Sequence, residues 1–219
     1  MRRVIRSLRH GHRDVSDQGL TLAELMVTLV LTSIVGTIML SATVTVTNTM
    51  KNNQATGDSL DIARSGINRI ARSIRAGIEI SRSGQSNQPA VDSMAPNSLV
   101  IYSSLGTAPT QITYSIDSNR QLIETRVAAS GTSPYWTFTG TGTSTVIASK
   151  IPTNASALFS YLDANGSALA IQTASDDATT GLVKEIQINL QVDSTPGLGA
   201  GPVTLTNTVV LPNEGVAKR

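Results

Sequence analysis

The chain has 219 residues and a formal net charge of +2, which is unevenly distributed. The first nineteen residues hold five arginines and two aspartates, a net of +3, so residues 20–219 carry a net of −1. This nearly neutral remainder gives no reason to expect nucleic-acid binding. The chain has no cysteine, which excludes disulfides and thiolate chemistry.

Both histidines, His10 and His12, lie in the basic N-terminal segment. Residues 20–219 therefore lack both His and Cys, and with them the commonest general base and the commonest zinc ligands. We expect no enzymatic activity, no cofactor and no metal site. A membrane-anchored hydrolase would have to use a Ser–Lys or a carboxylate pair.

Residues 25–50 contain no charged side chain. About twenty such residues rise about 30 Å in a helix, enough to cross the hydrocarbon core of a membrane. The arginines before this run should stay on the cytoplasmic side, with the C-terminal part outside. A secretory signal is the competing interpretation, but its apolar core would be shorter, and "LSATVT" at 40–45 is an imperfect cleavage site.

Residues 51–78 are predicted to continue as a water-soluble helix that ends near Gly77, before a loop at 81–89. One apolar stripe has helical spacing and should pack on a sheet: Leu60, Ala63, Ile67, Ile70 and Ile74. Arg64, Arg72 and Arg75 fall on another face and should be solvated.

From about Asn97 the apolar period changes to two, which predicts antiparallel strands. The runs are 98–103, 111–116, 121–127, 144–149, 157–162, 184–192 and 203–211. Turns are predicted at 117–120 and at 163–166, where Gly166 suits a positive φ. All seven aromatic residues lie in this half, so the core should be here. The predicted fold class is α+β, a long N-terminal helix packed on an antiparallel sheet.

Residues 19–36, "GLTLAELMVTLVLTSIVG", resemble the prepilin processing motif of type IV pilins and pseudopilins. The resemblance implies cleavage between Gly19 and Leu20 by a prepilin peptidase, N-methylation of Leu20, and a role for Glu24 as the fifth mature residue. Leu20 departs from the phenylalanine usual at this position. The segments 63–80, 112–126 and 159–169 more weakly resemble J-type minor pseudopilins and minor pilins.

The resemblance also implies a lollipop-shaped organisation. Residues 1–19 would be a cleaved cytoplasmic leader, 20–48 the transmembrane and filament-core half of the helix, 49–80 its soluble half, and 81–219 an extracytoplasmic head. The implied location is the inner membrane, with a single pass, and then a filament or the cell surface. The implied partners are the prepilin peptidase, other pilins or pseudopilins bound through the helix, and the inner-membrane assembly platform.

Glu24 has two interpretations. In the first, cleavage creates a cationic α-amine at Leu20, and Glu24 of a neighbouring subunit pairs with it in the low-dielectric layer, setting the register of a filament. In the second, "TLAE" is a capping box with Thr21 as N-cap and Glu24 at the third helical position. The two interpretations are compatible before assembly.

The sequence thus favours a minor pilin or pseudopilin of a type IV pilus, competence or type II secretion filament. The alternative is a membrane-anchored extracytoplasmic binding module. Two smaller questions stay open: whether "DANG" at 163–166 with Asp176 and Asp177 binds calcium or is only a turn, and whether Trp136, with Tyr135 and Phe138, forms a contact patch or part of the core.

Overall fold

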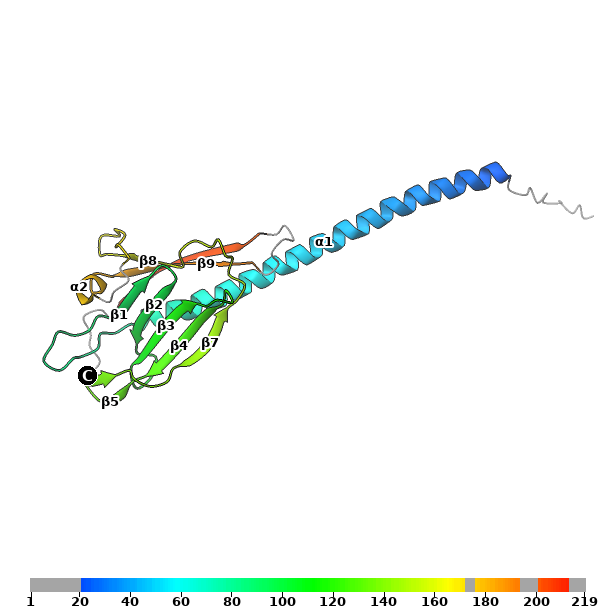
Figure 1. Ribbon diagram of the computed structural model, residues 1–219. Helices are drawn as coiled ribbons and strands as arrows, with labels where there is room; N and C mark the ends of the chain where they lie inside the picture. The colour runs from blue at the N-terminus through cyan, green and yellow to red at the C-terminus, as the bar shows by residue number, and fades with distance from the viewer. Residues whose placement is uncertain (1–20, 172–175, 194–200, 213–219) are drawn as a thin grey trace, which may run out of the picture. The chain divides into compact units, whose positions relative to one another are not determined.

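The computed structural model describes residues 21–171, 176–193 and 201–212, which form one long helix and a set of antiparallel strands (Figure 1). The chain divides into two compact units, Met1–Asn48 and Thr49–Arg219. The helix α1, Leu22–Arg75, has 54 residues and contributes to both units. A long apolar N-terminal helix and an antiparallel sheet were predicted, and both are present.

In the first unit, every described residue is exposed, including the large apolar side chains from Leu22 to Val46. By length and composition α1 is able to cross a membrane, and no part of its most apolar stretch is buried. An isolated helix with apolar side chains on all faces is unfavourable in water. This part of α1 therefore needs a membrane or a protein partner.

Most hydroxyl groups of the apolar stretch are hydrogen-bonded within the helix. Thr32, Ser33 and Thr37 donate to the carbonyl oxygen four residues earlier, at 2.7–2.8 Å. Thr43, Thr45 and Thr47 do the same at 2.8–2.9 Å. Since a satisfied hydroxyl avoids most of its desolvation cost, the threonines do not prevent the helix from entering an apolar environment.

In the second unit, α1 buries one stripe. The buried residues of the helix are Ala55, Ser59, Ala63, Gly66, Ile67, Ile70, Ala71, Ser73 and Ile74. Four of the five predicted stripe residues are among them, and Leu60 is half-buried. The three arginines predicted to be solvated are exposed.

The helix ends at Arg75, three residues before the predicted end, and the stop near Gly77 is confirmed. The Gly77 amide donates to the Ile74 carbonyl at 2.9 Å. A Cβ atom at position 77 would lie 2.9 Å from both the Ile74 carbonyl oxygen and Leu211 Cδ2. Glycine is thus required by the close approach of the chain at this point.

The strands form two sheets and a hairpin, whereas a single sheet was predicted. The first sheet has the order β1-β2-β3-β4-β7 and the second the order β10-β9-β8. The bounds are β1 Val91–Ala95, β2 Ser98–Ser103, β3 Thr110–Ile116, β4 Leu122–Ala128, β7 Thr143–Ala148, β8 Phe159–Leu162, β9 Glu185–Val192 and β10 Val203–Val210. The hairpin joins β5 Ser130–Thr132 to β6 Tyr135–Thr137, and a short helix α2 spans Asp177–Thr180.

All seven predicted runs contain a strand, but β1, β5, β6 and α2 were not predicted. In β1 a register shift between Val91 and Ser93 interrupts the alternation, so only Val91 and Met94 are buried. β5 and β6 are exposed or half-buried and have no apolar alternation to detect. Periodicity reveals only strands that bury one regular face.

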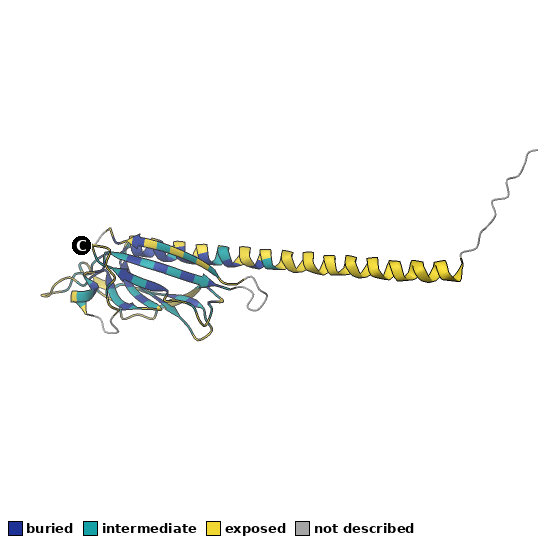
Figure 2. Cartoon of the chain, turned by 90° about the horizontal axis from the view of Figure 1, so that it is seen from above, coloured by how far each residue is buried: buried dark blue, intermediate teal, exposed yellow. Residues whose placement is uncertain are grey.

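Both sheets share one core with α1. The inward residues of β9, Ile186, Ile188, Leu190 and Val192, are fully buried, as their alternation predicts. At Gly66 the helix approaches both sheets: a Cβ there would lie 3.0 Å from Leu190 Cδ2 and 3.5 Å from Ala148 Cβ. Figure 2 shows the buried positions along the strands and the C-terminal part of α1.

The aromatic residues divide between two clusters. Tyr114, Phe159 and Tyr161 belong to the main core. Trp136 and Phe138 pack, half-buried, on a smaller cluster of Ile78, Ile80 and Tyr102. Tyr135 is exposed, so of the two alternatives left open for these three residues, core packing holds for Trp136 and Phe138 and not for Tyr135.

A buried carboxylate links α1 to the first sheet. The Arg69 guanidinium donates to both Glu124 oxygens at 2.9 Å, and Arg126 also bonds to Glu124. The Tyr114 hydroxyl lies 3.1 Å from Glu124 Oε2 and 2.8 Å from Ser73 Oγ. Burial alone would raise the pKa of Glu124, but hydrogen bonds from Arg69 and Arg126 outweigh it and lower the pKa.

We predict that Glu124→Gln lowers the free energy of unfolding by about 1–3 kcal/mol near neutral pH, because the arginines lose a charged acceptor. A lowered folded-state pKa means that the carboxylate stabilises the fold above its ordinary pKa of about 4.3 and that this contribution is lost as the pH falls through the folded-state value. The difference between wild type and variant should therefore shrink in acid.

Denaturant unfolding of the full chain in non-ionic detergent, followed by fluorescence of Trp136, measures this difference, since the chain has a single tryptophan. Arg72→Gln, an exposed change on the same helix, is the control and should alter stability by about 0.5 kcal/mol or less. If Glu124→Gln lowers the free energy of unfolding equally at pH 7 and pH 3, Glu124 is not a charged, stabilising partner of the arginines.

Candidate functional site at the N-terminal turn of the long helix

Of the three predicted site residues, Glu24 is described and the other two are not. Gly19 and Leu20, the predicted cleavage and methylation positions, lie outside the described residues. The processing site itself is therefore still a prediction. What the structure gives is the geometry of the first turn that follows it.

Thr21 caps α1. Its carbonyl oxygen accepts the first helical hydrogen bond, from the Leu25 amide at 3.1 Å, and its Oγ1 accepts from the Glu24 amide at 3.2 Å. Thr21 is thus the N-cap and Glu24 the third helical residue, as the capping-box interpretation predicts. The reciprocal bond, from the Thr21 amide to the Glu24 carboxylate, is absent from the hydrogen bonds among described residues.

The Glu24 carboxylate has no charged partner among the described residues. Glu24 is exposed. It is also the acidic residue of the first turn, where the helix dipole favours negative charge. Large exposed apolar residues surround it in sequence, among them Leu22, Leu25 and Met26. An unpaired carboxylate at the edge of an apolar surface can accept a cationic group brought by another molecule.

The three aspartates considered for calcium have separate local roles. Asp163 Oδ1 accepts from the amides of Asn165 and Ser167, both at 2.8 Å, and these bonds lower its pKa. The predicted turn at 163–166 is confirmed, with Gly166 at φ +76°. The Asp163 carboxylate therefore accepts hydrogen bonds from within the turn.

The other two aspartates belong to α2. Asp176 caps it, accepting from the Ala178 amide and from Thr179 Oγ1, and these bonds lower its pKa. Asp177 pairs with Arg82 at 2.5 Å. Within the described ranges, no group of three or more His, Cys, Asp or Glu side chains is placed to hold a metal ion.

The buried Glu124 and its paired arginines were not predicted from the sequence. The signal was present, because Glu124 follows Leu122 at the inward spacing of a half-buried strand. A carboxylate on an inward position requires a cation to pair with it.

The chain was compared with protein-family models, with curated proteins and with solved structures, and nothing matched.

We predict that Thr21→Ala weakens the first turn of α1 by about 1 kcal/mol, because the Glu24 amide loses its acceptor. In detergent micelles, hydrogen exchange at the Glu24 amide should accelerate about fivefold. Thr21→Ser keeps the hydroxyl and serves as the control. Equal exchange rates in the alanine and serine variants would contradict the cap.

Proposed function

We propose that the chain is a minor pilin or pseudopilin, a non-enzymatic structural subunit made as a precursor, processed after Gly19 and assembled through its N-terminal helix. The proposal is supported chiefly by one combination: Gly19, a carboxylate five residues later at Glu24, and an apolar helix without further charge. Capping alone explains Glu24, but it does not explain Gly19 or the basic segment before it.

The proposed chemistry begins with cleavage. Glycine at the scissile bond leaves the backbone unhindered for the peptidase, and cleavage produces a cationic amine at Leu20. An unpaired ammonium and an unpaired carboxylate each cost several kcal/mol to bring into an apolar layer, and pairing recovers much of that cost. Subunits whose amine and carboxylate meet would thus be favoured over those in other registers.

The exposed surface of α1 fits this mechanism. From Leu22 to Val46 the helix presents apolar side chains that no other described part of the chain covers. In the membrane, lipid would cover them. In a filament, the helices of neighbouring subunits would do so, which gives the subunit a way to leave the bilayer without exposing its apolar surface to water.

We predict that a prepilin peptidase converts the full chain to a product whose N-terminal residue is Leu20, and that Gly19→Val prevents the conversion by crowding the scissile bond. Intact-mass and N-terminal peptide measurements of membrane fractions check both. A mature chain that begins at any other residue would exclude the proposal, and cleavage within 40–45 would instead support a secretory signal.

We further predict that Glu24→Gln abolishes assembly and leaves membrane insertion unchanged. Glutamine at the third helical position is compatible with a capping box, so the change removes the charge and retains the polar cap. Membrane fractionation measures insertion, and recovery of the chain in sheared filaments measures assembly.

Asp58→Asn is the matched control, since it neutralises an exposed acid on the same helix and should assemble normally. A Glu24→Gln chain that assembles as well as the control would refute the salt-bridge role. If the chain retains its function in cells that form no filaments, the anchored binding module is the better description.

A further inference from the structure

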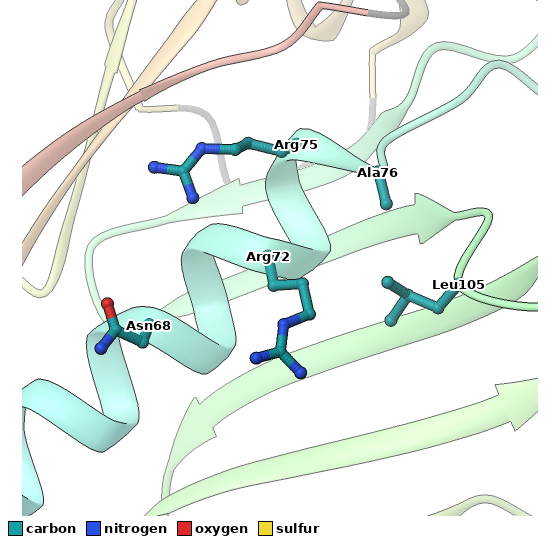
Figure 3. Close-up of a pocket in the computed structure, with 5 residues that line it drawn as sticks. All are labelled: Asn68, Arg72, Arg75, Ala76 and Leu105. Carbon is teal, nitrogen blue, oxygen red and sulfur yellow. The ribbon is translucent and has the colours of Figure 1, made fainter.

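A groove lined by arginines lies along α1 in the second unit, apart from the N-terminal turn. One hollow of about 430 Å³ is lined by Asn68, Arg72, Arg75, Ala76 and Leu105. A second, of about 370 Å³, is lined by Ser65, Asn68, Arg69, Arg72 and Arg126. Asn68 and Arg72 line both hollows, which are therefore adjacent, and the two together are called here the arginine groove. Figure 3 shows Asn68, Arg72 and Arg75 on successive turns of α1, with Leu105 on a neighbouring loop.

Two of the arginines have fixed positions. Arg69 and Arg126 bond to the fully buried side chain of Glu124, although their own side chains are about 40% exposed. Each guanidinium has five N–H donors, so donors not directed at Glu124 remain for a ligand. Little side-chain entropy would be lost on binding, since Glu124 already restrains these two side chains.

Arg72 lies between these anchored residues and the other end of the groove. Its side chain is exposed and forms no ion pair or hydrogen bond with the described residues. The structure therefore assigns to the arginine groove the binding of an acidic segment of a partner protein, with Arg72 as the central cationic contact. A guanidinium pairs with a carboxylate through two parallel hydrogen bonds, which favours side-chain carboxylates as ligands.

The length of the cationic surface supports a short acidic segment. On α1 the arginines of the groove extend from Arg69 to Arg75, about 9 Å at the helical rise. Asp58 and Asp61 are exposed on the turns before Arg64, and their negative charge would repel a polyanion that continued along the helix. A few carboxylates fit this length, whereas a long nucleic acid would meet the aspartates.

A lipid surface fits less well. Arg72 lies 22 residues after Met50, the last residue of the uncharged run, which is about 33 Å along an uninterrupted helix. The described lining of the groove also includes no aromatic side chain on which a nucleic-acid base would stack.

The proposal does not depend on filament assembly and concerns the unassembled chain.

The test measures binding of a fluorescent peptide of alternating glutamate and alanine to the full chain in non-ionic detergent, by anisotropy at low salt. We expect saturable binding that weakens as ionic strength rises, and none for the peptide with glutamine in place of glutamate. Arg72→Glu should weaken binding about tenfold or more. Arg64→Glu, the same charge change at an exposed arginine of α1 that lines neither hollow, should weaken it far less.

Other results would overturn the proposal. Absence of glutamate-peptide binding to the wild type, or equal losses in the two variants, excludes a site at Arg72. A single-stranded oligothymidylate of the same charge is measured alongside; if it binds more tightly and its binding requires Arg72, the groove is a nucleic-acid site. Unchanged unfolding midpoints for both variants ensure that a loss of binding reflects the groove.

Discussion

The fold of the second unit depends on one constraint, the burial of a single stripe of α1 by strands of both sheets. Ile67, Ile70 and Ile74 are at most 5% exposed and belong to the same cluster as the inward residues of β2, β3 and β9. Burying an isoleucine side chain contributes about 1.5–3 kcal/mol. Neither sheet could bury its inner face in the same way without the helix, so α1 is the central element of this core and not an appendage to it.

Most of the helices and strands could be predicted because their apolar residues recur at the period that the helix or strand backbone imposes. The isoleucines of α1 recur at helical spacing, and Ile186, Ile188 and Leu190 alternate with polar residues along β9. The division into two sheets was not predictable in the same way, since alternation shows which face of a strand is buried and does not identify its neighbour. β10 pairs with β9 and β9 with β8, but β8 does not pair with β7.

The candidate sites were also predictable only in part. The cap at Thr21 was predictable, because side-chain and amide spacing within one turn fixes the geometry. The arginine groove was not, since it depends on Arg126 of β4 lying near Arg69 and Arg72 of α1, residues more than fifty positions apart. Helical spacing correctly placed Arg72 on the solvated face of α1 but gave no information about what lies across from it.

The Glu124 network has a mechanical consequence. Arg69 and Ser73 are one turn apart on α1, and both are tied to the first sheet through Glu124 and Tyr114. An axial pull on α1 would load these directional bonds in shear, at a point where the apolar side chains alone would resist sliding only weakly. A tensile force on the helix would therefore reach the sheet through β3 and β4, the central strands that carry Tyr114 and Glu124.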